Sequence, residues 1–133
     1  MDNLYQLCDD ELWKKLSDKN GGVYKIIAVK DGKIVPQHRF LGIDTDGILY
    51  IGKATSYIDR VVGLVKSISP KYKGSSHICG RRYKSNPNIA KLFPFDTLHL
   101  DIVPSNEPEV IENKLLKEYF DKFGEAPPLN ALY

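Results

Sequence analysis

Two tyrosines that stand beside glycines are the first residues in this sequence whose types and spacing suit chemistry. Tyr24 follows Gly22 by two positions and Tyr50 precedes Gly52 by two positions, each in an apolar, β-branched stretch. A glycine in a strand often marks the close approach of another backbone or of a ligand, so we expect the two hydroxyls to line one pocket. A free tyrosine has a pKa of about 10, so a tyrosine that acts as a base at neutral pH needs a nearby cation or metal. The alternative is that both are ordinary sheet aromatics.

Two cations follow Tyr50 closely and are candidates for that help. Lys53 comes three residues after Tyr50, and Arg60 falls about one turn into the helix that we expect next. The fork of donors on a guanidinium group can hold a phosphate as negative charge builds up in a transition state. The alternative for Arg60 is a charge on the surface of a helix.

One carboxylate occupies a suggestive position. Glu112 stands at the border of the apolar face of an expected helix, with Leu116 and Tyr119 four and seven residues further on. Mg²⁺ commonly takes only one or two carboxylates and keeps several waters, so one such ligand is chemically adequate. The alternative is an ordinary exposed glutamate.

A strongly basic middle region is hidden by the net charge of +2. Residues 60–95 hold eight Lys and Arg and no acid, whereas residues 96–133 hold three basic and eight acidic residues. Cations interleaved with Tyr72, Tyr83 and His77 suit a phosphate backbone with occasional stacking on a base. The alternative is a solvated loop with counterions. The residues expected to bind a nucleic-acid backbone are Lys71, Lys73, Arg81, Arg82 and Lys84.

Hydrophobic periods and turn signals predict the elements that position these residues. The pattern predicts strands over 23–29, 48–52 and 97–103, with a hairpin turn at Asp31-Gly32 and a return over 33–35. It predicts helices up to residue 20, over 56–68, after Asn86-Pro87, and from Asn106 to Phe123. This order indicates an α+β fold, in which a small three-stranded antiparallel sheet is flanked by helices.

Several boundaries follow from single residues. Asp9 or Asp10 is expected to cap the first helix, and Asn106 with Glu109 resembles a capping box. Residues 69–85 are expected to form an exposed and mobile basic loop.

Length and composition favour one domain over residues 1–133, since 133 residues with 42% apolar content suit a single core without disulfides. Cys8 and Cys79 are therefore expected to be reduced thiols in a cytoplasmic protein. No apolar run reaches the length of about 18 residues that a membrane span needs, and the first residues lack the order of a signal peptide.

These residues, taken in order, resemble the GIY-YIG nucleases. The resemblance covers residues 22–130 and rests on five elements, each on the expected type of secondary structure. The elements are Gly22-Val23-Tyr24, then Tyr50-Ile51-Gly52 with Lys53-Ala54, then Arg60, then Glu112 with Leu115, Leu116, Lys117 and Tyr119, and finally Pro128-Leu129-Asn130.

The resemblance implies a catalytic role for each central residue. It implies that Glu112 is the sole protein ligand of Mg²⁺ or Mn²⁺ and that Tyr24 orients or activates the attacking water. It also implies that Tyr50 contacts the scissile phosphate, while Arg60 and Lys53 neutralise its charge.

Two further roles and one departure come with the resemblance. It implies that His77 takes part in catalysis and that Asn130, grouped here with the substrate-binding residues, buttresses the site. The family usually joins its first two strands by a short hairpin, whereas here residues 31–47 form an insertion. Surface loops accept such additions at small entropic cost, so the insertion affects our expectation of substrate choice rather than of the core.

We therefore expect a metal-dependent endonuclease that hydrolyses phosphodiester bonds in DNA. One alternative is a catalytically inactive nucleic-acid-binding module of the same fold, and another is a domain whose basic loop docks an acidic protein. Specificity is expected to come from the insertion, from a homodimer or from a partner protein, and the sequence does not select among them.

Overall fold

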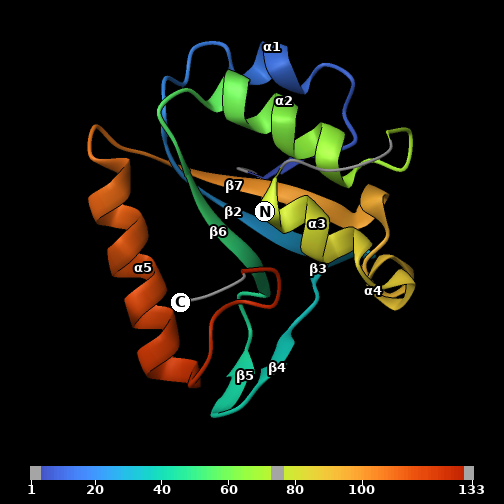
Figure 1. Cartoon of the computed structure of the whole chain (residues 1–133), viewed down its shortest axis with the longest axis vertical. Helices are drawn as coiled ribbons and strands as arrows, with labels where there is room; N and C mark the ends of the chain where they lie inside the picture. The colour runs from blue at the N-terminus through green and yellow to red at the C-terminus, as the bar shows by residue number, and fades with distance from the viewer. Residues whose placement is uncertain (1–3, 73–76, 131–133) are drawn as a thin grey trace.

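A central antiparallel sheet carries most of the residues of interest. The computed structural model describes residues 4–72 and 77–130 (Figure 1). The strands of the sheet are β1 Leu4–Gln6, β2 Gly22–Lys30, β3 Lys33–Ile34, β6 Ile48–Ala54 and β7 Leu98–Pro104. Their order is β1-β7-β2-β3, and β6 also pairs with β2. The expected α+β class is confirmed; β6, β2 and β7 are the three expected strands, and the short β1 and β3 extend the sheet.

Helices cover both faces of this sheet. In the described part of the chain they are α1 Leu12–Leu16, α2 Tyr57–Ile68, α3 Ile78–Lys84, α4 Pro87–Leu92, α5 Pro108–Phe123 and the 3₁₀ helix η1 Phe95–Thr97. The larger buried cluster joins one face to α1, α2 and α3. Figure 1 shows α5 standing apart from the other helices. A second cluster joins α5 to the opposite face, where Tyr119 and Phe123 pack against Val23, Ile48 and Ile51.

Strand β2 lies at the centre because it pairs with β6 and β7 over the same residues. Across β2 and β6, Tyr24 is the partner of Gly52 and Ile26 is the partner of Tyr50. Side chains alternate along a strand, so this register turns Tyr24 and Tyr50 to the same face. Both rings belong to the larger cluster, beneath α2 and α3.

Local signals place several helix ends correctly. Helix α2 begins after Ser56, whose hydroxyl accepts a hydrogen bond from the Asp59 amide, and Gly124 ends α5 with a φ of 75°. The capping box expected at Asn106 is wrong, since the residue before α5 is Glu107 and its side chain makes no capping bond. Pro108 explains the start, because proline is preorganised for the first position of a helix.

The N-terminal segment differs from the expectation of one helix up to residue 20. Helix α1 is short and begins after Glu11, while the Asp9 carboxylate accepts a hydrogen bond from the Glu11 amide. Strand β1 precedes it, with Tyr5 paired to Leu100 of β7. This pairing satisfies backbone groups that would otherwise remain free at the edge of β7.

The expectation of an exposed basic loop over residues 69–85 is wrong for residues 78–84, which form α3. Gly80 and Tyr83 of this helix are buried, so the Tyr83 ring packs in the core and does not stack on a base. Helix α3 packs closely on α2, since a Cβ atom at Gly80 would collide with Ser67. Lys73 lies outside the described residues.

The inserted segment is folded rather than irregular. Asp31 and Gly32 have φ values of 52° and 73°, which matches the turn predicted between β2 and β3. Strands β4 Gln37–Arg39 and β5 Gly42–Asp44 form a separate two-stranded sheet. Figure 1 shows this hairpin projecting beside the C-terminal end of α5.

Two simpler expectations concern membranes and thiols. Among the described residues, none of the helices combines the length and the apolar character that crossing a bilayer requires. Cys8 and Cys79 are both free.

Candidate functional site

The register of β2 and β6 brings the two motif tyrosines together over a glycine. The ring centroids of Tyr24 and Tyr50 lie 6.0 Å apart. A Cβ atom at Gly52 would lie 2.6 Å from the Tyr24 hydroxyl and 2.7 Å from Cε2 of Tyr50. A close approach does occur beside this glycine, but the approaching group is the pair of aromatic rings rather than another backbone or a ligand.

His77 joins this pair from the start of α3. Its side chain is 3% exposed, its Nε2 lies 3.0 Å from the Tyr24 hydroxyl oxygen, and its ring lies edge-on to Tyr50. Its Nδ1 accepts a hydrogen bond from the Cys79 amide at 3.1 Å and so caps α3. Burial, followed by the charges of Arg60 and Arg81, lowers the pKa of His77 to about 4.

The tautomer of His77 follows from these contacts. A neutral imidazole carries one hydrogen, and Nδ1 is occupied as an acceptor. The hydrogen is therefore on Nε2, which donates it to the oxygen of Tyr24. The hydroxyl hydrogen of Tyr24 therefore points to a group other than His77.

Both tyrosines are protonated at neutral pH in this environment. Burial raises the pKa of Tyr24, with a further rise from Tyr50, while the charge and side-chain hydrogen bond of Arg60 lower it. Burial also raises the pKa of Tyr50 to about 12, against the lowering effect of Arg60. Deprotonation of either phenol thus needs more positive charge than the chain itself supplies.

Arg60 is the exposed cation that faces all the other predicted catalytic residues. It lies in the first turn of α2, and its charge acts on the pKa values of Tyr24, Tyr50, His77 and Glu112. A guanidinium group this close to the buried rings can hold an anionic substrate beside them.

Glu112 approaches the same point from α5, on the other side of the edge strand β6. Burial raises the pKa of this half-buried carboxyl group, Glu109 raises it further, and the charges of Lys53 and Arg60 lower it. Within the described chain, Glu112 makes no hydrogen bond or ion pair. The exposed Lys53 is instead 3.8 Å from Glu109.

The donor set near Glu112 suits a hard cation that keeps most of its waters. Among the described residues, no three His, Cys, Asp or Glu side chains gather as a metal cluster. A single unpaired carboxylate that is already partly desolvated fits Mg²⁺ or Mn²⁺ bound mainly by water and substrate oxygens. The three charged residues that act on the pKa of Glu112 also line a cleft open to solvent, whose lining is Lys53, Ala54, Thr55, Ser56, Asp59, Arg60, Pro108 and Glu109.

The structure divides the predicted backbone-binding residues into several groups. Arg81 and Arg82 are exposed on α3, and Arg81 lies near enough to His77 to affect its pKa. Arg82 donates a hydrogen bond to the Pro128 carbonyl at 3.2 Å, and Lys84 donates one to the Tyr72 carbonyl at 2.8 Å. The basic face of α3 therefore adjoins the site.

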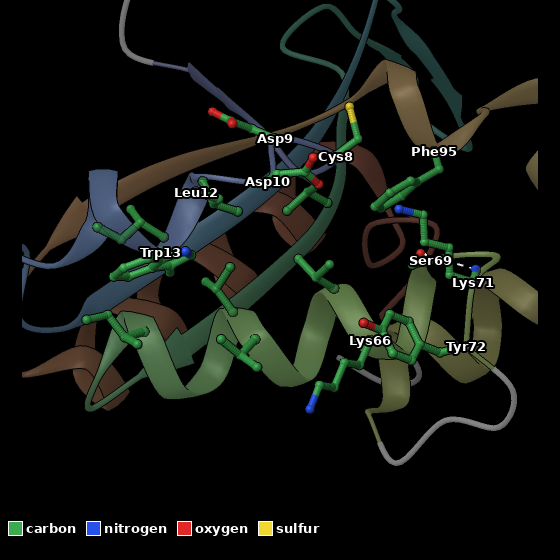
Figure 2. A pocket seen from close by; sticks show the side chains of 16 residues that line it. Cys8, Asp9, Asp10, Leu12, Trp13, Lys66, Ser69, Lys71, Tyr72 and Phe95 are labelled. Carbon is green, nitrogen blue, oxygen red and sulfur yellow. Dashed lines mark hydrogen bonds between the residues drawn. The ribbon is translucent and has the colours of Figure 1, made fainter.

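Lys71 lies at the end of an apolar groove between α1 and α2 (Figure 2), next to Tyr72, whose carbonyl accepts the bond from Lys84 of α3. The groove includes the half-exposed Trp13 and Tyr72, with Lys66 at its rim. None of the predicted catalytic residues is among those described as lining it.

Asn130 holds the strand that carries Tyr50. Its Oδ1 accepts from the Ile51 amide and its Nδ2 donates to the Ile51 carbonyl, each at 3.0 Å. Leu129 adds a hydrogen bond to the Leu49 carbonyl. The side-chain amide is thus engaged with the main chain of β6, as the expected buttress would be, and its grouping with the substrate-binding residues stays a prediction.

Two residues that help to shape the site were absent from the sequence-based predictions. The Tyr57 hydroxyl donates a hydrogen bond to the Val23 carbonyl at 2.8 Å, next to Tyr24. Asp44, in the insertion, accepts a hydrogen bond from Tyr119 of α5. In the sequence, Tyr57 is a tyrosine directly after a helix cap and Asp44 is an aspartate before a turn. Both patterns are common on protein surfaces, so neither predicts a residue that shapes a site.

Comparison with known proteins adds no relative from which a function can be taken: no family model, curated protein or solved structure matches this chain.

Proposed function

We propose that this protein is a metal-dependent endonuclease that hydrolyses phosphodiester bonds in DNA, in the manner of the GIY-YIG nucleases it resembles. The observation that carries the proposal is the convergence of five residues from β2, β6, α2, α5 and the cap of α3. These residues are Tyr24, Tyr50, Arg60, His77 and Glu112. Structural packing alone gives no reason for a buried tyrosine–histidine pair, an exposed arginine and an unpaired carboxylate to meet.

In this proposal the tyrosine–histidine pair handles the attacking water. His77 donates its Nε2 hydrogen to Tyr24, so the hydroxyl hydrogen of Tyr24 remains directed elsewhere. The Tyr24 oxygen then orients or activates water, and the donated hydrogen bond stabilises negative charge on that oxygen.

The phosphate is held from the open side of the site. Arg60 and Lys53 neutralise the charge that develops on its oxygens, and Tyr50 contacts it from below. Mg²⁺ or Mn²⁺ bound to Glu112 would supply the Lewis acidity that stabilises the departing 3′ oxygen. Cations of α3 and Lys71 follow the DNA backbone, which provides affinity without reading the sequence.

The proposed cellular setting is the cytoplasm. Two free thiols, Cys8 and Cys79, support it, since disulfides are rare in that compartment. Recognition of a particular site on DNA is assigned to the insertion, to a homodimer or to a partner protein.

The decisive experiment compares cleavage of supercoiled plasmid and labelled single strands by the parent and by Glu112→Gln, with Mg²⁺, Mn²⁺ or EDTA. The variant keeps the size of the side chain but removes the charge that a hard cation needs. We expect metal-dependent nicking by the parent, none by Glu112→Gln, and DNA binding that persists or tightens in the variant.

The matched control is Glu118→Gln, which removes an exposed carboxylate on the same helix, 4.0 Å from Lys114. It should cleave as the parent does. Cleavage by Glu112→Gln at the parent rate would refute the one-metal mechanism. Binding of DNA by the parent without any cleavage would favour the inactive nucleic-acid-binding module.

A further inference from the structure

The inserted hairpin β4–β5 is hydrogen-bonded to the C-terminal end of α5, the helix that carries Glu112. The Leu41 amide donates to the Phe123 carbonyl at 3.0 Å, and the Phe40 amide donates to the Glu125 carboxylate at 2.7 Å. Arg39 completes the contact with an ion pair to Glu125 at 2.9 Å. Segments about 80 residues apart in the sequence are thus hydrogen-bonded at the C-terminal end of α5.

A buried carboxylate at the base of the hairpin joins two elements of the candidate site. Asp44 is 2% exposed, and its Oδ2 accepts hydrogen bonds from the Tyr119 hydroxyl at 2.9 Å and from the Ile48 amide at 3.0 Å. Its Oδ1 accepts from the Asp46 amide at 2.9 Å. The carboxylate therefore bonds to α5, to the start of β6 and to the turn that leads into β6.

The positions of these donors along their elements relate Asp44 to the site. Tyr119 lies seven residues after Glu112, or about two helical turns on the same side of α5. Ile48 lies two residues before Tyr50 in β6. One carboxylate thus links the helix of the proposed metal ligand to the strand of a proposed phosphate contact.

Packing alone fixes such a helix incompletely. The apolar contacts of α5 with the sheet are non-directional, so they resist separation more than sliding along the helix axis. Hydrogen bonds weaken steeply when distance and angle change, so the bond from Tyr119 opposes sliding of α5, because the Ile48 and Asp46 amides hold the carboxylate that accepts it. Tyr119 also packs on Phe123, with ring centroids 4.7 Å apart, and an apolar ring without the hydroxyl would keep that packing.

We propose that Asp44 and Tyr119 are positioning residues, through which the inserted segment sets where α5 presents Glu112 relative to Tyr50. This inference rests on the proposed nuclease function for its effect on catalysis. Its structural part concerns the helix alone and is measured without DNA or metal.

The test uses the full chain with Tyr119→Phe and Asp44→Asn, and with Tyr83→Phe as a matched control. The control also removes one buried tyrosine hydroxyl, which bonds to the Phe93 carbonyl away from α5. Tyr119→Phe keeps the packed ring, so it remains informative where Asp44→Asn leaves a backbone amide unpaired and fails to fold. Amide hydrogen exchange is measured over residues 111–117, and kcat and KM are measured on plasmid well below the unfolding temperature of each variant.

We expect exchange in the first turns of α5 to become about tenfold faster in Tyr119→Phe, as removal of a hydrogen bond to a buried charge implies, with exchange in β2 unchanged. We expect kcat to fall by about 10- to 100-fold with KM unchanged, because small displacements of a catalytic group are costly. Tyr83→Phe should leave both measurements at the parent values.

Parent-like exchange in α5, or parent-like kcat with faster exchange, would overturn the inference. Should the parent itself fail to cleave DNA, the proposed function fails, and the exchange measurement still decides whether Asp44 and Tyr119 hold α5.

Discussion

At the scale of single residues, Gly52 is the point on which the two tyrosines depend. Any side chain there must displace the Tyr24 or Tyr50 ring, since its Cβ atom would lie 2.6 Å from the Tyr24 hydroxyl. Both rings are buried, at 0% and 5% exposure, so neither has free space to move into. The glycine is thus part of the geometry of the site.

We expect Gly52→Ala to lower the free energy of unfolding by about 1–3 kcal/mol, as overpacked cores do, and to reduce cleavage strongly. The matched control is Gly63→Ala in α2, where the added Cβ meets nothing within 4 Å. That change should raise stability by about 0.5–1 kcal/mol through helix propensity. Urea unfolding measures both, and a neutral Gly52→Ala would contradict the close approach.

Tyr24→Phe removes a single oxygen from the centre of the site. The ring remains packed, so the fold should survive, while cleavage should fall by at least about 100-fold, as it does when a positioned acid or base is removed. Plasmid nicking measures the change, and Tyr5→Phe on β1 is the control. Near-parent cleavage by Tyr24→Phe would make Tyr24 a packing residue.

At the scale of elements, His77 links the start of α3 to the sheet and makes the stability of the fold depend on pH. The pKa of His77 falls from 6.5 to about 4 on folding, mainly through burial, with Arg60 and Arg81 facing it. Between these pH values the unfolded chain binds a proton that the folded protein does not. The free energy of unfolding therefore falls as the pH decreases through this window.

His77→Asn separates the two roles of this side chain. Asparagine is a good helix cap, so α3 should persist, while the titrating ring and its bond to Tyr24 are removed. We expect the variant to lack the part of the pH dependence between about 6.5 and about 4 that the parent shows in urea unfolding. Identical pH profiles would mean that the pKa of His77 does not change on folding.

At the scale of the whole molecule, charge is distributed unevenly over the fold. Eight cations lie in residues 60–95, which include α3 and most of α2, and the acidic excess lies in residues 96–133, which include α5. The proposed DNA surface therefore follows α2 and α3 and meets the acidic helix α5 at Glu109 and Glu112. This arrangement leads to a measurable dependence of binding on salt.

We expect the double change Lys71→Ala with Arg81→Ala to weaken binding to duplex DNA. The slope of log K against log salt should become shallower by about 0.9 for each phosphate that the variant no longer neutralises. The control replaces Lys14 and Lys33, two exposed lysines outside the basic region. Fluorescence anisotropy over a range of salt concentrations measures the slopes. An unchanged slope in the Lys71 and Arg81 variant would mean that these two cations do not contact DNA phosphates.

The sequence by itself determined the main strands and two of the helices around the candidate site. Strands β2, β6 and β7 and helices α2 and α5 follow from apolar periods of two and of about 3.6 residues, with Gly124 as a helix stop. These signals are local, because the apolar period of a segment marks the face that it will bury, whichever segments it packs against. The candidate residues of the site were chosen from their types, their spacing and the resemblance that these carry, and their catalytic roles stay predictions.

Only the tertiary structure decided how distant segments meet. Strand β1 pairs with β7, α3 folds against Ser67, and Asp44 reaches Tyr119, in each case through partners from another part of the sequence. The Tyr24–His77 contact is of the same kind, spanning 53 positions. Hydrogen bonds and close packing depend on the position of both partners, so the pattern of either segment alone does not reveal them.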